Sequence, residues 1–138
     1  MKKRIRVVCA VIEKEGKILI ASRLYGNMAG KWEFPGGKYE AGESGEEAIK
    51  REIREEMEME IEVRERFCTV EHDYPEFHLS MDCYLCSMKE ETFRLHDHSA
   101  VCWISSAEEK IDFADADVKV YQAYRDYLKE RLSVSPGK

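Results

Sequence analysis

The chain has 138 residues, the length of one domain, and 43% of them are hydrophobic, which is sufficient for a buried core. Its net charge of −6 excludes a general binder of the nucleic-acid backbone, because such a protein needs a basic surface. No apolar run approaches membrane-spanning length. The basic residues before the short apolar run at 7–12 do not make a signal peptide, so we expect a cytoplasmic protein without a membrane partner.

The apolar pattern predicts a series of extended segments bounded by turns and charged stretches. These segments are residues 5–12, 17–23, 32–34, 61–74, 77–86 and 100–104. One helix is predicted from Ser44, a good N-cap residue, to about Met57, and a second over 117–132. This order predicts an α/β fold in which helices sandwich a mixed sheet (α/β/α). We expect one domain over 1–132 and a short flexible tail over 133–138.

The five cysteines do not indicate a disulfide framework, because an odd count without a secretory signal favours free thiols. Cys83 and Cys86 have the spacing of a metal knuckle, but they lie in an alternating strand. Residues three apart on a strand face opposite sides of the sheet. The two thiols should therefore diverge, and we expect no zinc site there.

The central helix carries acidic residues where an amphipathic helix would bury itself. At about 100° per residue, its apolar stripe consists of Ile49, Ile53 and Met57. Glu52 and Glu56 fall inside the same arc, and Glu55 lies at its edge. An acidic run is usually a solvated face, but a solvated run avoids the apolar arc, and buried carboxylates need a partner charge or a metal. The three glutamates can converge on one cation, and hard oxygen ligands suit Mg²⁺ or Mn²⁺.

Glycines surround this helix on its N-terminal side. Gly36 and Gly37 follow Phe34-Pro35, and two further glycines flank Glu43. Such glycines permit a positive φ and close approach of the backbone, so we expect a glycine turn that completes a concave acidic site. Magnesium held by few carboxylates takes water and substrate phosphates into its shell. The pattern therefore indicates chemistry on a phosphate ester or phosphoanhydride.

The stretch 37–59 resembles the Nudix box, G-x5-E-x7-R-E-U-x-E-E-x-G-U, in which U is a bulky aliphatic residue. The positions that match at the required spacing are Gly37, Glu43, Arg51, Glu52, Ile53, Glu55, Glu56 and Met59. Glu58 stands where the pattern has Gly, in the turn after the helix, so we expect the helix to run slightly longer or to end differently. The resemblance extends over most of residues 1–132 and implies the Nudix fold and a hydrolase.

The resemblance also implies roles for the residues of the box. Magnesium, or manganese, would be bound by the group Glu52, Glu55, Glu56 and the carbonyl of Gly37. Arg51 would orient Glu52 through an arginine–carboxylate fork, and Glu43 would support the site or pair with Arg51. An ordinary i,i+4 pair of Arg51 with Glu55 or Glu47 is compatible with that role.

Relatives that act on the nucleotide pool place a further acidic residue six positions before a tryptophan. Here that residue is Asp97, before Trp103. Asp97 is a candidate metal ligand or general base, and its alternative is a solvated loop aspartate. We interpret its neighbours His96 and His98 as surface residues.

The segment through Gly37 is similar to MutT-type enzymes and CTP pyrophosphohydrolases, which release a nucleoside monophosphate and pyrophosphate. This similarity implies that Arg23 lies near the phosphates or the base and that Asp117 recognises the base. The alternatives are a solvated strand-end charge for Arg23 and a helix N-cap for Asp117. Phe34 and Tyr74 are further candidates for substrate binding.

The leading hypothesis is therefore a magnesium-dependent nucleoside triphosphate pyrophosphohydrolase that sanitises the nucleotide pool and so supports DNA repair. Its substrate would be a damaged or cytosine-type nucleotide, and we expect a monomer or homodimer. One alternative is a Nudix module that senses a nucleotide without cleaving it. Another is a hydrolase of nucleotide sugars or other nucleoside diphosphate derivatives.

Overall fold

The computed structural model describes residues 2–23, 30–90, 94, 98–108 and 110–133. Its elements in chain order are β1 (Lys3–Lys14), β2 (Lys17–Arg23), β3 (Trp32–Glu33), β4 (Gly36–Lys38), α1 (Gly45–Met57), β5 (Ile61–Asp73), β6 (Phe77–Met88), β7 (His98–Ser105) and α2 (Asp115–Ser133). Within the described residues, no helix combines the length and the apolar character needed to cross a membrane.

A seven-stranded mixed sheet forms the middle layer, with the order β3-β2-β1-β6-β5 along its main path. β1 and β6 run parallel, whereas β5 pairs antiparallel with β6. β7 pairs antiparallel with β2, and β4 pairs antiparallel with the middle of β1. The pairing of β4 brings the start of the acidic segment to the centre of the sheet.

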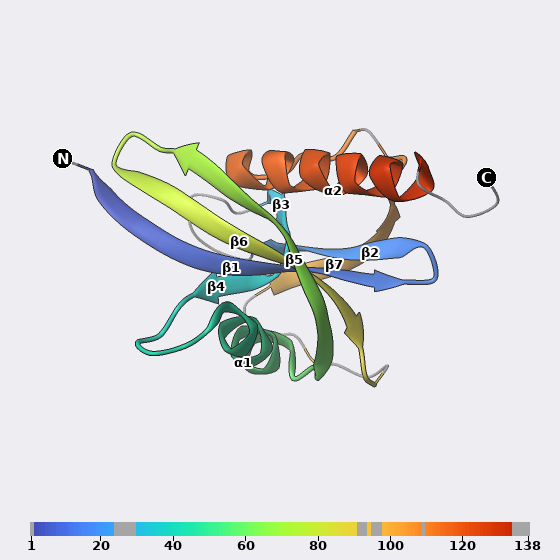
Figure 1. The fold of residues 1–138 in the computed structure, drawn as a ribbon, viewed down its shortest axis with the longest axis horizontal. Coiled ribbons are helices and arrows are strands. Elements are labelled where there is room, and N and C mark those ends of the chain that lie inside the picture. The colour runs from blue at the N-terminus through green and yellow to red at the C-terminus, as the bar shows by residue number, and fades with distance from the viewer. Residues whose placement is uncertain (1, 24–29, 91–93, 95–97, 109, 134–138) are drawn as a thin grey trace.

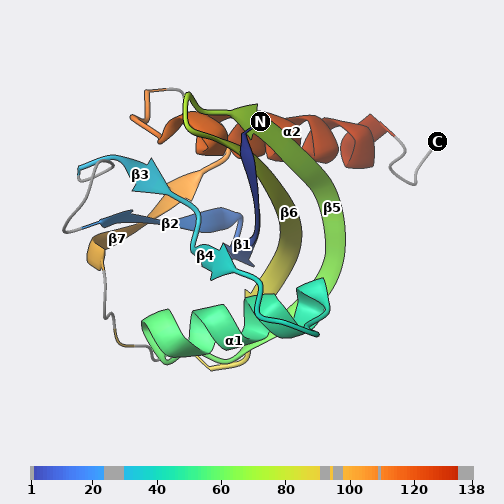
Figure 2. The same ribbon diagram turned by 90° about the vertical axis from the view of Figure 1, so that its left-hand side faces the viewer.

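The two helices cover opposite faces of this sheet, as Figures 1 and 2 show. β1 explains how the layers hold together, because its side chains alternate between two separate cores. Val8 and Ala10 pack in the core that contains α1, whereas Cys9 and Val11 pack in the core that contains α2. A strand that is buried on both faces reads as a continuous apolar run, which is what β1 shows.

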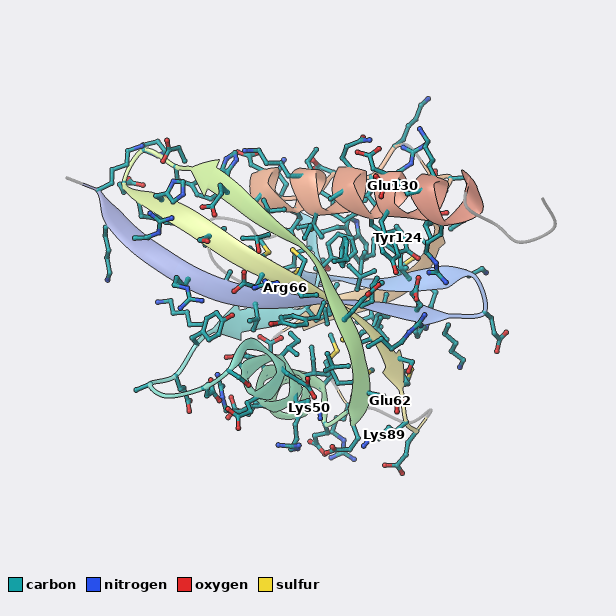
Figure 3. The ribbon with its side chains drawn as sticks, in the orientation of Figure 1. Lys50, Glu62, Arg66, Lys89, Tyr124 and Glu130 are labelled. Carbon is teal, nitrogen blue, oxygen red and sulfur yellow. The ribbon has the colours of Figure 1, made fainter. Side chains whose placement is uncertain are left out.

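The α/β/α architecture predicted from the sequence is confirmed. α1 contributes the predicted apolar stripe to one core, and Tyr124 points from α2 toward the strands in Figure 3. Cys83 and Cys86 belong to different cores, so the prediction that these thiols diverge is also confirmed.

Several boundaries differ from the sequence-based expectations. Gly36 and Gly37 belong to β4 and are not a turn, because backbone pairing with β1 keeps them extended. α2 begins at Asp115, so Asp117 lies inside its first turn and is not the N-cap. β1 extends to Lys3 at its charged end because parallel pairing with β6 continues there. α2 includes Ser133, and residues 134–138 of the predicted tail lie outside the described residues.

Candidate active site

A capping box determines where α1 begins. The backbone N–H of Glu47 donates to Ser44 Oγ at 3.1 Å, and the backbone N–H of Ser44 donates to Glu47 Oε1 at 2.9 Å. Ser44 is thus the N-cap, as predicted. The helix buries Ile49 and Ile53 completely against the sheet. Glu52 therefore lies at the margin of the packed face, where its side chain is 15% exposed.

The guanidinium of Arg51 connects the acidic residues of the loop and the helix. Its Nε and Nη2 donate to the two carboxylate oxygens of Glu43 at 2.6 and 3.0 Å. Its Nη1 donates to Glu52 and to Glu55, each at 3.1 Å. Nη2 also donates to the carbonyl of Lys38 at 2.9 Å. The pairings of Arg51 with Glu43, Glu52 and Glu55 that were considered from the sequence coexist in the structure, whereas Glu47 Oε1 accepts from the backbone of Ser44.

This network is an ordered set of charges, in contrast to a solvated acidic face. Arg51 and the backbone N–H of Glu40 donate to Glu43 and hold its pKa below the usual value. The contact with Glu43 also raises the pKa of Arg51, so both groups are ionised at neutral pH. The side chains of Arg51 and Glu43 are each only 16% exposed.

Gly37 lies directly against the carboxylate of Glu52. A Cβ placed on Gly37 would come within 2.3 Å of Glu52 Cδ and Oε1, so any side chain there would displace the Glu52 carboxylate. The neighbouring Gly36 faces backbone instead, because its Cβ would lie 2.0 Å from the carbonyl oxygen of Val8. The absence of a side chain at Gly37 thus brings the backbone of β4 and an acidic side chain of α1 together.

A cavity of about 250 Å³ opens beside this contact, on the α2 side of Gly37. Its lining includes the aromatic residues Phe34, Tyr74 and Phe77 and two carboxylate residues, Glu33 and Asp117. The rest of the lining is mostly apolar: Val7, Val8, Cys9, Leu79, Met81, Ala114 and Ala116. An apolar slot with a few polar groups is typical of a small-molecule site.

Asp117 of α2 lines the cavity and bonds to the backbone just after β3. Its side chain is buried, and its Oδ1 accepts a hydrogen bond from the backbone N–H of Phe34 at 2.8 Å. The ring of Phe34 stacks on Phe113 with centroids 5.4 Å apart. Tyr74 stacks on Phe77 at 4.9 Å, and its hydroxyl accepts from the backbone N–H of Ala116 at 3.3 Å. These contacts fix one wall of the cavity.

The residues of the acidic helix are a chemically suitable but not preassembled cation site. Among the described residues, no three His, Cys, Asp or Glu side chains are already arranged as a metal-binding group. The donors are nevertheless all oxygens, as Mg²⁺ requires. Glu52 is nearly covered, Glu56 Oε1 is shielded from solvent, and Glu55 is 58% exposed. The close approach at Gly37 adds a backbone segment to this donor set.

The structure brings together most of the site residues named from the sequence. Glu43, Glu52 and Glu55 contact Arg51. The cavity beside them is lined by Phe34, Tyr74 and Asp117. The backbone of Arg23 ends β2, but its side chain is outside the described set, as is Asp97. Glu33 was not singled out from the sequence, because one acidic residue in a two-residue strand gives no periodic signal.

The family profile described as the NUDIX domain matches residues 7–123 of this chain. The chain belongs to the Nudix family. A CTP pyrophosphohydrolase of Escherichia coli (strain K12) is 36% identical over 124 residues, which cover 88% of this chain and 92% of that protein. An 8-oxo-dGTP diphosphatase of Proteus vulgaris is 38% identical over 86 residues, which cover 61% of this chain and 77% of that protein.

Two solved structures agree with the fold. The solution structure of the E. coli ORF135 protein is 32% identical with a TM-score of 0.79, and the match covers 99% of this chain and 96% of that one. The crystal structure of a MutT NUDIX hydrolase from Burkholderia pseudomallei is 26% identical with a TM-score of 0.80, covering 88% of this chain and 98% of that one. These likenesses extend over both helices and the sheet, well beyond the box.

The Nudix box also explains where α1 ends. Glu58 occupies the box position of glycine and adopts φ 49° and ψ 40°, a left-handed conformation. Its backbone N–H donates to the carbonyl of Arg54 at 2.9 Å. The helix therefore ends at Met57 and does not run longer, which corrects one of the two expectations for this position.

Proposed function

We propose that this Nudix protein hydrolyses nucleoside triphosphates to a nucleoside monophosphate and pyrophosphate with the help of Mg²⁺. The observation that carries the proposal is the position of Gly37. This residue lines the cavity and also lies against the Glu52 carboxylate, so a ligand in the cavity has its phosphates beside the acidic helix. The names of the relatives, a CTP pyrophosphohydrolase and an 8-oxo-dGTP diphosphatase, support the same reaction class.

In this proposal, the box residues hold the cation and move the proton. Glu52, Glu55, Glu56 and the carbonyl of Gly37 would be the ligands. When bound, Mg²⁺ would neutralise phosphate oxygens and lower the pKa of an attacking water. A carboxylate not engaged in binding would accept the proton of that water. Asp97 is a candidate for this base or for a further ligand, although it lies outside the described residues.

Arg51 prepares this site by keeping the glutamates in place. Its contact with Glu43 fixes the guanidinium, and its Nη1 then holds Glu52 and Glu55 on one side. Mn²⁺ could replace Mg²⁺ because it accepts the same oxygen ligands. Arg23, at the end of β2, is a candidate partner for the phosphates.

The cavity would hold the base, and its polar groups favour bases with amino or ring N–H donors. Asp117 is a carboxylate, which accepts hydrogen bonds and cannot donate when ionised. Its Oδ1 accepts a hydrogen bond from the backbone N–H of Phe34, and the residue lines the cavity. The amino group of cytosine and the donors of guanine or 8-oxoguanine satisfy this requirement. Tyr74 and Phe34 would provide aromatic surface.

A substrate panel tests the proposal. CTP, dCTP, 5-substituted dCTP, dGTP and 8-oxo-dGTP are compared with Mg²⁺, and pyrophosphate is measured beside orthophosphate. We expect pyrophosphate with at least one of these nucleotides. Release of orthophosphate instead, or hydrolysis of nucleotide sugars alone, would assign a different reaction. Binding of a nucleotide without turnover would favour the sensing module.

The variant Glu56→Gln tests the ligand set. It removes one negative charge at nearly constant volume, so we expect turnover to be lost while the circular dichroism spectrum is unchanged. Glu46→Gln is the matched control on the same helix, because Glu46 is exposed and pairs with Lys50 at 3.3 Å. Full activity of Glu56→Gln at saturating Mg²⁺ would exclude Glu56 as a ligand.

A further inference from the structure

A second polar network lies beside the loop between β4 and α1. At its centre is Asp82 of β6, whose side chain is only 9% exposed. Thr69 Oγ1 donates to Asp82 Oδ1 at 2.8 Å, and the hydroxyl of Tyr39 donates to Oδ2. The guanidinium groups of Arg6 and of Arg66, the latter labelled in Figure 3, lie 3.5 and 3.8 Å from the same carboxylate. A buried carboxylate is thus fully engaged at a place where the sheet meets the loop.

Tyr39 is the member of this network that belongs to the loop. Its ring packs against the guanidinium of Arg6, with Cζ 4.5 Å from the ring centroid. Its hydroxyl lies at the start of α1, because a Cβ on Gly45 would be 3.0 Å from it and 1.9 Å from the hydroxyl of Tyr84. Tyr39 is therefore held by its ring on one side and by its hydroxyl on Asp82.

The same loop wraps around Arg51. The guanidinium binds the carbonyl of Lys38, immediately before Tyr39, and the carboxylate of Glu43, four residues after it. Glu40 and Glu43 are joined by two hydrogen bonds, from Glu43 N to Glu40 O at 3.1 Å and from Glu40 N to Glu43 Oε1 at 2.8 Å. A displacement of Tyr39 would therefore change where Glu43 holds Arg51.

We propose that the hydrogen bond from Tyr39 to Asp82 positions this loop and, through Glu43 and Arg51, sets the orientation of Glu52 toward the divalent cation. The inference rests on the proposed function for the identity of that cation. Tyr39 and Asp82 are positioning residues, because neither of them lines the cavity. Residues that hold metal ligands in place through hydrogen bonds commonly affect metal affinity and activity.

The test compares Tyr39→Phe with Tyr127→Phe. Each variant removes one tyrosine hydroxyl that donates to a carboxylate, but Tyr127 lies on α2 and donates to Glu65, away from the box. Binding of Mn²⁺ to the full chain is measured by electron paramagnetic resonance, which needs no turnover. We expect Tyr39→Phe to bind Mn²⁺ about tenfold more weakly and to have a kcat about tenfold lower. Its KM for the nucleotide at saturating Mg²⁺ should stay within about twofold.

Asp82→Asn provides the second arm of the test, and the double variant completes a double-mutant cycle. If the two residues act through their shared hydrogen bond, the double variant should lose little more Mn²⁺ affinity than Tyr39→Phe alone. Unchanged Mn²⁺ affinity in Tyr39→Phe, or an equal loss in Tyr127→Phe, would overturn the inference. Failure of the wild-type chain to hydrolyse any triphosphate would instead overturn the proposed function, because the Mn²⁺ titration still reports on the loop.

Discussion

At the scale of single residues, two adjacent glycines are required for different reasons. A side chain at Gly36 would collide with the backbone of β1, where the nearest atom is the carbonyl oxygen of Val8 at 2.0 Å. A side chain at Gly37 would collide with the flexible end of Glu52. Backbone in a paired strand cannot give way without breaking the pairing, whereas a side chain can rotate. Gly36 should therefore matter for the fold and Gly37 for the site.

We predict that Gly37→Ala loses activity and that Gly36→Ala loses stability. Gly37→Ala displaces the Glu52 carboxylate, so its activity should fall about 10- to 100-fold, while its free energy of unfolding changes by less than about 1 kcal/mol. Gly36→Ala should be less stable by on the order of 3 kcal/mol. Urea unfolding and pyrophosphate release measure the two effects. Equal losses of stability in both variants would contradict the distinction.

At the scale of elements, α1 ends at a position that favours glycine. Glu58 has φ 49°, and a side chain in the left-handed region is strained by contact between its Cβ and the backbone. Glycine has no Cβ and is the usual residue at such a helix end. Glu58, which stands where the Nudix box has glycine, therefore lowers the stability of the fold but does not move the end of the helix.

Glu58→Gly should be more stable than the wild-type chain by about 1 kcal/mol, because the strain at this position is relieved. Glu58→Ala is the control, since it removes the same charge but keeps a Cβ. Only the glycine variant should show a raised midpoint of thermal unfolding, and the activity of both variants should be unchanged. A gain of equal size in Glu58→Ala would indicate that the charge is responsible.

In the hairpin of β5 and β6, two carboxylates hold the side chain of His78 through contacts that depend on pH. Its Nδ1 lies 2.8 Å from Asp73 Oδ1, and its Nε2 lies 2.7 Å from Glu71 Oε1. Lys2 and Arg4 face the same two carboxylates at 3.5 and 3.7 Å. Hydrogen bonding to Asp73 and then to Glu71 raises the pKa of His78 above its ordinary value of 6.5.

A raised pKa in the folded state gives stability that is fully present below pH 6.5 and is lost as pH rises through the folded pKa. We therefore predict that wild type is more stable than His78→Gln at pH 5.5 and that this difference shrinks by pH 9. Thermal unfolding of both proteins measures the difference, and an NMR titration of the ring protons gives the pKa directly. A difference that stays constant over this range would contradict the proposed pH dependence of the His78 contacts.

At the scale of the whole molecule, the sheet separates two cores, and the acidic site lies at the margin of one of them. The core on the α2 side includes Val120 and Cys9, and the core on the α1 side includes Ile53 and Val8. The carboxylates of α1 contribute negative charges that repel one another until a cation binds. Binding of the cation to the folded chain should therefore stabilise the whole domain.

We predict that Mg²⁺ raises the midpoint of thermal unfolding relative to EDTA. At a Mg²⁺ concentration of 100 times Kd, the gain in the free energy of unfolding should be about 2.7 kcal/mol. Glu56→Gln should lose most of this gain because it removes a proposed ligand. Val120→Ala, which alters the opposite core, should unfold at lower temperature but keep the gain. An equal effect of Mg²⁺ on wild type and Glu56→Gln would place the cation elsewhere.

Local patterns in the sequence were sufficient for the order of the elements and for the face of α1 that carries the glutamates. The helical period placed Ile53 on the buried side of α1 and Glu52 beside it, and the resemblance to the Nudix box implied the pairing of Arg51 with Glu43. The prediction for the helix succeeds because residues three or four apart on a helix share a face whatever the rest of the chain does. The same holds for Ser44, whose capping partner is three residues away.

Contacts between residues far apart in the chain depend on the order of the strands, and no local period reports that order. Asp117 meets Phe34 across 83 positions, and Asp82 meets Tyr39 across 43. From its local pattern Asp117 therefore read as a helix N-cap, while the resemblance implied that it recognises the base, and Asp82 gave no signal at all. Only the packing of β4 on β1 and of the two helices on opposite faces brings such groups together, because the free energy of burial is gained by the assembled layers and not by any segment alone.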